Sequence, residues 1–219
     1  MFGVKVEVWG DYALFSRPEL KVERCTYEVM TPSAARGIMD SIYWHPGLSW
    51  KIDRIYVLNP IQYMNIRRNE VNKKMSASNV LTAMRGGDKD LQIITSAEIA
   101  QRAALVLRDV HYVIEAHFEM TDQANGTDNH GKFSDIIRRR LEKGSCYSQP
   151  YLGCREFTAY FQPWPKEHKI VTAYANETLD LGYMLYDMDY SDPEDIKPIF
   201  FHGVLQNGVL DLTSLEVQP

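Results

Sequence analysis

Alternating hydrophobic and polar positions predict the first β-strand at residues 4–8, where three valines are separated by charged residues. A period of two places every second side chain on the same face of a strand, so that one face is buried. Comparable patterns predict three further strands, at residues 50–58, 109–120 and 155–162. In the second of these three, the predicted buried face consists of Val110, Tyr112, Ile114, Ala116, Phe118 and Met120.

Two other segments have the spacing of amphipathic helices. The first begins at Thr31-Pro32, because threonine caps helices and proline suits the first helical position, and it extends to about residue 44, before Pro46-Gly47. The second follows a loop at residues 121–131 and ends at Gly144. Its predicted buried stripe consists of Phe133, Ile136, Ile137 and Leu141.

The order strand, helix, strand, strand, helix, strand is that of the ferredoxin-like unit, a topology that RNA-recognition domains share. Residues 61–103, between the two middle strands, are polar, and we interpret them as a hairpin or a mobile insertion. After Pro163-Trp164-Pro165 interrupts the pattern, the remainder is rich in strand signals, and Asn207-Gly208 predicts a tight hairpin.

We therefore expect an α+β protein. Residues 1–164 are predicted to form a ferredoxin-like (RRM-like) βαββαβ domain with a basic hairpin insertion. Residues 165–219 are predicted to form a small, β-rich C-terminal domain with an antiparallel sheet.

Composition narrows the class of protein. The net charge of −5 disfavours a generic nucleic-acid-binding protein, although the positive residues are clustered and can still form a local basic stripe. Cys25, Cys146 and Cys154 have neither CxxC spacing nor an even count, so we expect no zinc site, no disulfide framework and a reducing cytoplasm. Neither a signal peptide nor an apolar run of about 20 residues is present, so no membrane partner is expected.

The sequence predicts no metal site and no cofactor. His111 and His117 share a strand face but lie six residues apart, about 20 Å at the rise of a strand. Neither a Walker loop nor a Gly-x-Ser-x-Gly elbow is present. Acid–base chemistry without a metal remains, and it suits RNA, which supplies its own nucleophile in the 2′-hydroxyl.

Three residues are candidates for such catalysis. Tyr43 ends the first predicted helix, where its hydroxyl either reaches a groove or packs under the Pro-Gly turn. Lys132 lies near the start of the second helix, where backbone N–H groups favour a phosphate; otherwise it is an ordinary solvated lysine. His130 lies in the preceding loop, where it is either a catalytic group or an ordinary surface histidine.

Basic residues in several segments are candidates for RNA binding. Those of the insertion fit contacts with backbone phosphates, whereas the three adjacent arginines at 138–140 spread around their helix and cannot all meet one ligand. His111 is also compatible with a structural role between strands. The predicted RNA-binding residues are Arg36, Arg67, Arg68, Lys73, Lys74, Arg108, His111, Arg138 and Arg139.

Six strings give the chain a specific resemblance. They are GDYALF (10–15), GIMDSIYW (37–44), NPIQ (59–62), LRDVHY (107–112), AHF (116–118) and LGCRE (152–156). In this order along most of the chain, they resemble the CRISPR-associated Cas-five family in its subtype I-C (Dvulg) branch.

The resemblance implies a metal-independent endoribonuclease that cleaves CRISPR precursor RNA at the repeat stem-loop. Such a protein stays on the 5′ handle of the product, the crRNA, together with other subunits of the type I-C surveillance complex. In the family, the reaction is assigned to a tyrosine that matches Tyr43 and to a Lys-His pair. Lys132 matches the lysine, but Phe133 stands in place of the histidine.

The departure at Phe133 leaves several readings open. His130 supplies the missing imidazole, or Tyr43 and Lys132 suffice at a lower rate. Alternatively, the protein is a non-catalytic RNA-binding subunit that caps the crRNA 5′ handle. A weaker third reading is a ferredoxin-like metabolic or regulatory protein, which the lack of any small-molecule motif disfavours.

Overall fold

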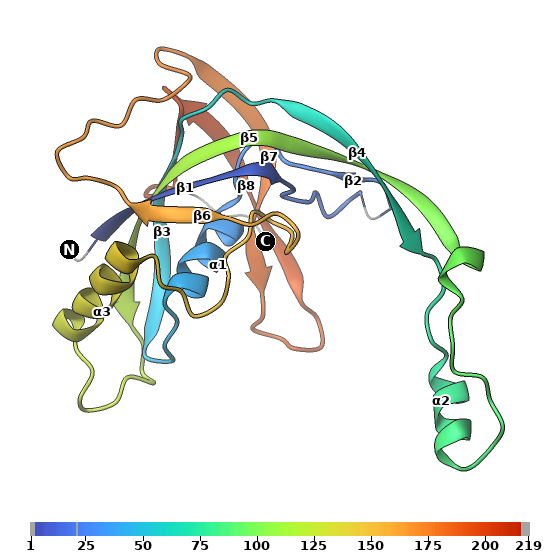
Figure 1. Ribbon diagram of the computed structural model, residues 1–219. Coiled ribbons are helices and arrows are strands. Elements are labelled where there is room, and N and C mark those ends of the chain that lie inside the picture. The colour runs from blue at the N-terminus through green and yellow to red at the C-terminus, as the bar shows by residue number, and fades with distance from the viewer. Residues whose placement is uncertain (1–2, 21, 216–219) are drawn as a thin grey trace.

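The computed structural model describes residues 3–20 and 22–215. The predicted domain ranges also include residues 1–2, 21 and 216–219, which lie outside the described residues. One long, curved and largely antiparallel sheet dominates, with strand order β6-β1-β5-β3-β9-β8-β7 (Figure 1). The chain is therefore a mixed α/β protein with an antiparallel sheet and few helices, which confirms the predicted class at this level.

The centre of the sheet is β5 (Ile99–Met120), which pairs antiparallel with β1 (Gly3–Ala13) on one side and β3 (Leu48–Val57) on the other. The short β2 (Arg24–Cys25) pairs parallel with β5. Val6 and Val8 are fully buried, as the period of two predicted. Five of the six residues on the predicted inner face of β5 are also buried, and Met120 is partly buried against the core.

Two helices lie on the same side of this sheet, α1 (Pro32–Ile42) and α3 (His130–Lys143) (Figure 1). The predicted start of α1 is confirmed, because Thr31 Oγ1 accepts a hydrogen bond from the Ala34 N–H at 3.3 Å. The predicted end of α3 is also confirmed, since Gly144 adopts the left-handed conformation with φ 62°. Both helices contribute to one hydrophobic core with β1, β3 and β5. None of the helices in the described residues is long and apolar enough to cross a membrane.

The structure corrects two predicted boundaries. His130 is the first residue of α3 and not part of the loop, because the Asn129 side chain caps the helix. The last predicted strand, at 155–162, is wrong over its first half, since β6 comprises only Tyr160–Pro163. Backbone hydrogen bonds close residues 152–157 into turns, with Leu152 N–H donating to Phe157 O at 2.8 Å, so these groups cannot form a ladder.

A long hairpin projects from the rest of the fold. We call this hairpin the arm, and we call the rest of the fold the body. It consists of β4 (Tyr63–Val71), α2 (Ala77–Met84), the 3-10 turn η1 (Thr95–Ala97) and residues 99–107 of β5. β4 pairs with that half of β5, and α2 lies at the far end of the arm (Figure 1). The sequence did not predict α2, because none of its residues is buried and no core face imposes a pattern.

The C-terminal strands are β7 (Thr178–Asp189), β8 (Lys197–Gln206) and β9 (Val209–Asp211). The predicted hairpin is confirmed, since Asn207 and Gly208 have φ values of 53° and 74°, as a tight turn between β8 and β9 requires. β9 also pairs with β3, so these strands extend the edge of the central sheet.

Candidate active site

Tyr43 lies where α1 ends, and its surroundings are largely apolar. Its backbone is extended (φ −147°, ψ 116°), and the Trp50 indole donates to its carbonyl oxygen at 3.0 Å. The ring lies 6.0 Å from the ring of Phe133, and the Arg140 guanidinium lies over it at 5.4 Å. Only 6% of Tyr43 is exposed, so its ring is packed inside the fold, beside charged neighbours.

The protonation state of Tyr43 follows from this environment. Burial raises the pKa of its phenol, Lys132 acts in the opposite direction, and Asp128 raises it further. Burial outweighs the attraction of the cations, so the phenol keeps its proton beyond the usual range. Tyr43 is therefore suited to donate a hydrogen bond or a proton, and poorly suited to act as a base.

Lys132 is held near Tyr43 by the first turn of α3. Asn129 Oδ1 accepts from the Lys132 N–H at 2.9 Å, and Lys132 Nζ lies 2.8 Å from Asp128 Oδ1. The hydrogen bond from Lys132, with one from the Asn125 N–H, lowers the pKa of the Asp128 carboxyl. The Asp128 side chain is shielded within its loop, with 0% of it exposed, so a fixed carboxylate orients the ammonium group.

His45 belongs to the same cluster, although it was not among the predicted site residues. Its ring lies 4.9 Å from that of Phe133, and its Nε2 lies 3.9 Å from Asp128 Oδ2. Nδ1 accepts a hydrogen bond from the Gly47 N–H at 3.0 Å, so this nitrogen carries no proton and the neutral ring carries it on Nε2. One signal was present in the sequence: in an extended segment, residues two apart point the same way, as Tyr43 and His45 do.

These groups define the catalytic corner: Tyr43, His45, Asp128, Lys132 and Arg140, arranged around the fully buried Phe133. Arg140 fixes the two helices together, because its Nη1 donates to Ile42 O at 2.9 Å. The corner offers several hydrogen-bond donors and positive charges, whereas its carboxylate is occupied. That arrangement suits the stabilisation of a negatively charged group such as a phosphate.

His130 has a different setting from the one predicted. Its ring stacks on Phe118, with centroids 5.7 Å apart and an angle of 24° between the planes. It is held at the first position of α3 and not in a flexible loop. Phe133, the residue at the position of the family histidine, is 0% exposed, so the predicted buried stripe is confirmed there.

Other predicted RNA-binding residues of the body have partners within the fold. Arg36 pairs with Asp187 at 2.7 Å and thereby joins α1 to β7. His111 Nε2 lies 2.7 Å from Glu7 Oε1, between β5 and β1, in agreement with the structural alternative. Arg108 donates to Gln62 at 2.6 and 2.8 Å.

The insertion contains four of the predicted RNA-binding residues. Arg67 and Arg68 lie on β4, and Lys73 and Lys74 lie between β4 and α2, so all four belong to the arm and not to the catalytic corner. Arg68 pairs with Glu156 and lies over the Phe157 ring at 5.2 Å. Lys73 pairs with Glu98 at 3.4 Å. Arg67 and Lys74 are exposed.

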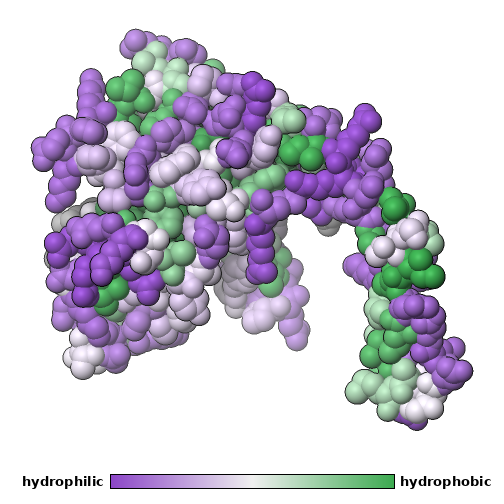
Figure 2. All heavy atoms as spheres, in the orientation of Figure 1, coloured by the Kyte–Doolittle hydropathy of each residue, from purple (hydrophilic) through white to green (hydrophobic). Residues whose placement is uncertain are grey.

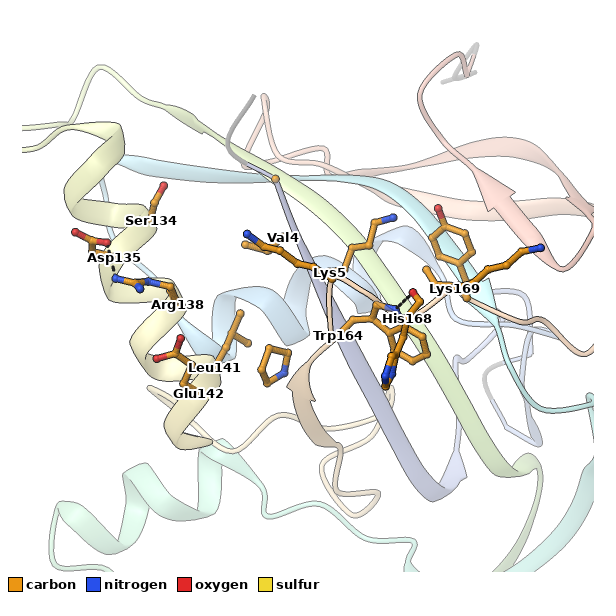
Figure 3. Close-up of a pocket in the computed structure, with 15 residues that line it drawn as sticks. Val4, Lys5, Ser134, Asp135, Arg138, Leu141, Glu142, Trp164, His168 and Lys169 are labelled. Atoms are coloured by element: carbon orange, nitrogen blue, oxygen red, sulfur yellow. Dashed lines mark hydrogen bonds and ion pairs between the residues drawn. The ribbon is translucent and has the colours of Figure 1, made fainter.

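A groove of about 1000 Å³ runs between α3 and the segment after β6 (Figure 3). Its positive side chains are Lys5, Arg138, Lys166 and Lys169, and Trp164 and His168 line it beside them. Two predicted residues of α3 fall at or near this groove: Arg138 pairs with Asp135 at 3.0 Å, and Arg139 donates to the Asp135 carbonyl at 3.1 Å. The groove and the catalytic corner thus use different faces of the same helix.

Comparisons with known proteins show which proteins this chain resembles in fold and in sequence. A solved structure titled "Crystal Structure of CRISPR-associated Protein" has a TM-score of 0.73 and 25% identity, over 99% of this chain and 96% of that one. Proteins named CRISPR pre-crRNA endoribonuclease Cas5d are similar in sequence. The one from Mannheimia succiniciproducens is 45% identical over 95% of this chain and 94% of its own length. The one from Thermus thermophilus is 37% identical over 100% of this chain and 94% of its own length.

The family assignment rests on nearly the whole chain. The model described as CRISPR-associated protein (Cas_Cas5) matches residues 3–213, which include α1, α3 and all the residues of the catalytic corner. The chain belongs to the Cas5 family of CRISPR-associated proteins, in its Cas5d branch.

Proposed function

We propose that this protein is a metal-independent endoribonuclease that cleaves CRISPR precursor RNA at the repeat stem-loop. The observation that carries the proposal is that Tyr43, at the end of α1, packs against Phe133, the residue next to Lys132 at the start of α3, so that the phenol and the ammonium group belong to one corner. The activity named for the two Cas5d relatives supports it. Lys132 supplies the positive charge that a metal ion supplies in other nucleases.

In the proposed reaction, the 2′-oxygen attacks the adjacent phosphorus and the bond from phosphorus to the 5′-oxygen breaks. The proton of the 2′-hydroxyl passes to solvent water, and Tyr43 protonates the departing 5′-oxygen and is reprotonated by water. Lys132 stabilises the negative charge that develops on the phosphate oxygens. The products are a 2′,3′-cyclic phosphate and a 5′-hydroxyl.

His45 takes the place that the sequence assigned to His130. Its Nε2 lies beside Asp128. The His45 side chain is 29% exposed, so an RNA phosphate can approach it. Because Nδ1 accepts from the Gly47 N–H, His45 serves as a hydrogen-bond donor to the phosphate and not as the base. Asp128 is a positioning residue, which holds Lys132 and faces His45.

The finer parts of the predicted architecture belong to the same proposal. The order β6-β1-β5-β3, with α1 and α3 as crossovers, supports a ferredoxin-like unit within residues 1–164 and the arm as its hairpin insertion. Residues 165–219 are proposed as the C-terminal domain, attached through β9. The predicted location remains the cytoplasm.

We also propose where RNA and partners bind. The groove beside α3 receives the RNA backbone, with Arg138 and Arg139 at its rim, and the product stays bound by its 5′ handle. The arm, with Arg67, Arg68, Lys73 and Lys74, meets the RNA and neighbouring subunits of the type I-C surveillance complex. Arg36, Arg108 and His111 lie neither in this groove nor on the arm, and we propose them as the weaker RNA contacts.

The test incubates the purified protein with its cognate repeat RNA in EDTA and sequences the ends. Cleavage that persists in EDTA, and that a 2′-deoxy substitution at the cut nucleotide abolishes, supports the proposed reaction. Strict dependence on magnesium, or cleavage of the deoxy substrate, contradicts it. Tight binding without cleavage establishes the second candidate, a non-catalytic cap on the crRNA 5′ handle, which the phenylalanine at position 133 favours.

A further inference from the structure

Next to the catalytic corner, two large aromatic side chains are exposed to solvent. Trp44 is 52% exposed and Tyr147 is 69% exposed, and their ring centroids lie 6.4 Å apart with 35° between the planes. All four tryptophans lie among the described residues, and Trp44 is the most exposed of them. Exposed aromatic rings are costly in water, so a pair of them at one place indicates a binding surface.

The backbone explains why Trp44 faces outward. Tyr43 has extended angles, and successive side chains of an extended segment point to opposite sides. Tyr43 and His45 therefore both face Phe133, and Trp44, between them, faces the opposite way and is exposed to solvent. The same three residues thus present catalytic groups on one side and an aromatic ring on the other.

Tyr147 is held in place from a different part of the chain. Its N–H donates to Ser41 O at 2.8 Å, and the Ser148 N–H donates to the same oxygen at 3.1 Å. These bonds tie the segment after α3 to the last turn of α1. The backbone that carries each ring is therefore anchored next to the catalytic corner, which limits the entropy lost when a ligand binds.

The indole of Trp44 also retains a free donor. Among the described residues, Trp50 Nε1 donates to Tyr43 O and Trp164 Nε1 donates to His168 O, whereas no hydrogen bond engages the Nε1 of Trp44 or of Trp9. Of these two tryptophans, Trp44 is the more exposed. A π-face with an unused N–H is suited to stack on a nucleobase and to hydrogen-bond its edge or a phosphate.

We propose that Trp44 and Tyr147 form a stacking site for an unpaired nucleobase of the RNA, next to the phosphate held at the catalytic corner. Charge complementarity favours RNA over an apolar protein segment, because the Arg140 guanidinium lies over the ring of the neighbouring Tyr43 and donates to Ile42 O. Stacking tolerates any base and fixes the strand beside the cut. The site rests on the proposed RNA-processing function, and it deepens that function by naming how the flanking nucleotide is held.

The experiment measures binding of repeat RNA with a 2′-deoxy nucleotide at the cut site, so that cleavage does not enter. Trp44→Leu should weaken binding by roughly tenfold, and Trp44→Phe, which keeps a ring, should retain most of the affinity. Tyr190→Leu is the matched control, since Tyr190 is 64% exposed and lies beyond the end of β7. Equal affinity of wild type and Trp44→Leu overturns the proposal.

A second measurement identifies the ligand as a base. Abasic substitutions are placed one at a time in the nucleotides that flank the cut, and each RNA is bound to wild type and to Trp44→Leu. At one position the two losses should not add, because both remove the same stacking contact. Additive losses at every position overturn the proposal. Loss of partner-subunit binding by Trp44→Leu with unchanged RNA affinity also overturns it, in favour of a protein contact.

The outcomes separate this site from the proposed function. The protein has the stacking site without the nuclease activity if it never cleaves, but the affinity losses from Trp44→Leu and from one abasic substitution do not add. A protein that cleaves in EDTA with no defect in Trp44→Leu has the activity without the stacking site.

Discussion

The catalytic corner and the arm are built in opposite ways. In the corner, Tyr43 and Phe133 are at most 6% exposed, and the side chains of His45, Lys132 and Arg140 are each held by a hydrogen bond or ion pair. In the arm, α2 has no buried residue, and Leu81, Met84 and Ile94 are 53%, 79% and 59% exposed (Figure 2). Packing thus fixes the side chains proposed to react, whereas an unpacked extension leaves apolar surface exposed.

The largest expected effect is on the corner. Lys132→Ala and Tyr43→Phe should each slow single-turnover cleavage by about 100-fold or more, because they remove charge stabilisation or proton donation. RNA affinity should change far less. Lys143→Ala, at the other end of α3, is the matched control. Wild-type rates in both corner variants would show that the site lies elsewhere.

A smaller effect distinguishes two histidines. His45→Ala should slow cleavage at saturating RNA by about tenfold or more, since it removes a donor to the phosphate. Added imidazole should restore part of the rate, which a purely structural defect would not allow. His130→Ala, whose ring stacks on Phe118, should have little effect. The opposite ranking of the two variants returns the role to His130.

Removal of the arm's tip should hardly affect the chemistry. Val71 and Ile99 are paired across the hairpin, so residues 72–98 can be replaced by Asn-Gly, which closes two-residue hairpins. Cleavage at saturating RNA should stay within about twofold of wild type, because the tip carries proposed RNA contacts but, among the described residues, none of the hydrogen-bond or ion-pair partners of the corner. Assembly with the other subunits, followed by co-purification, should be lost. A cleavage defect as large as that of Lys132→Ala would remove the distinction between the two regions.

The smallest expected effect is a shift in titration. Because burial raises the pKa of Tyr43, its phenol should ionise above the value of about 10 that is usual for tyrosine. The associated stability is present below pH 10 and is lost as pH rises through the folded-state pKa. An ultraviolet difference titration of wild type against Tyr43→Phe measures this. Ionisation below pH 10 would contradict the assignment of Tyr43 as a donor.

Local signals in the sequence were sufficient for the elements that have a core face. The valine alternation of β1, the Thr31-Pro32 start of α1 and the Gly144 end of α3 were all predicted and are confirmed. They were predictable because burial imposes a period, and caps satisfy backbone groups within a few residues. The resemblance, and not the spacing, pointed to Tyr43 and Lys132.

Elements without a core face were missed for the same reason. No buried stripe marks α2, and the true start of β6 depends on turns in which Gly153 has φ 81°. Pairing of β9 with β3 also left no signal in the sequence, because register between distant strands is set by the assembled sheet.

The sequence by itself determined the elements that have a buried face, the start of α1, the end of α3 and the family. Only the tertiary structure decided which residues share the corner: it brought His45 and Asp128 to Lys132, and it placed the His130 ring on Phe118. The physical reason is the distance along the chain over which each effect acts. Hydrophobic period and capping act over a few residues, whereas the meeting of α1 with α3 depends on the packing of both against one sheet.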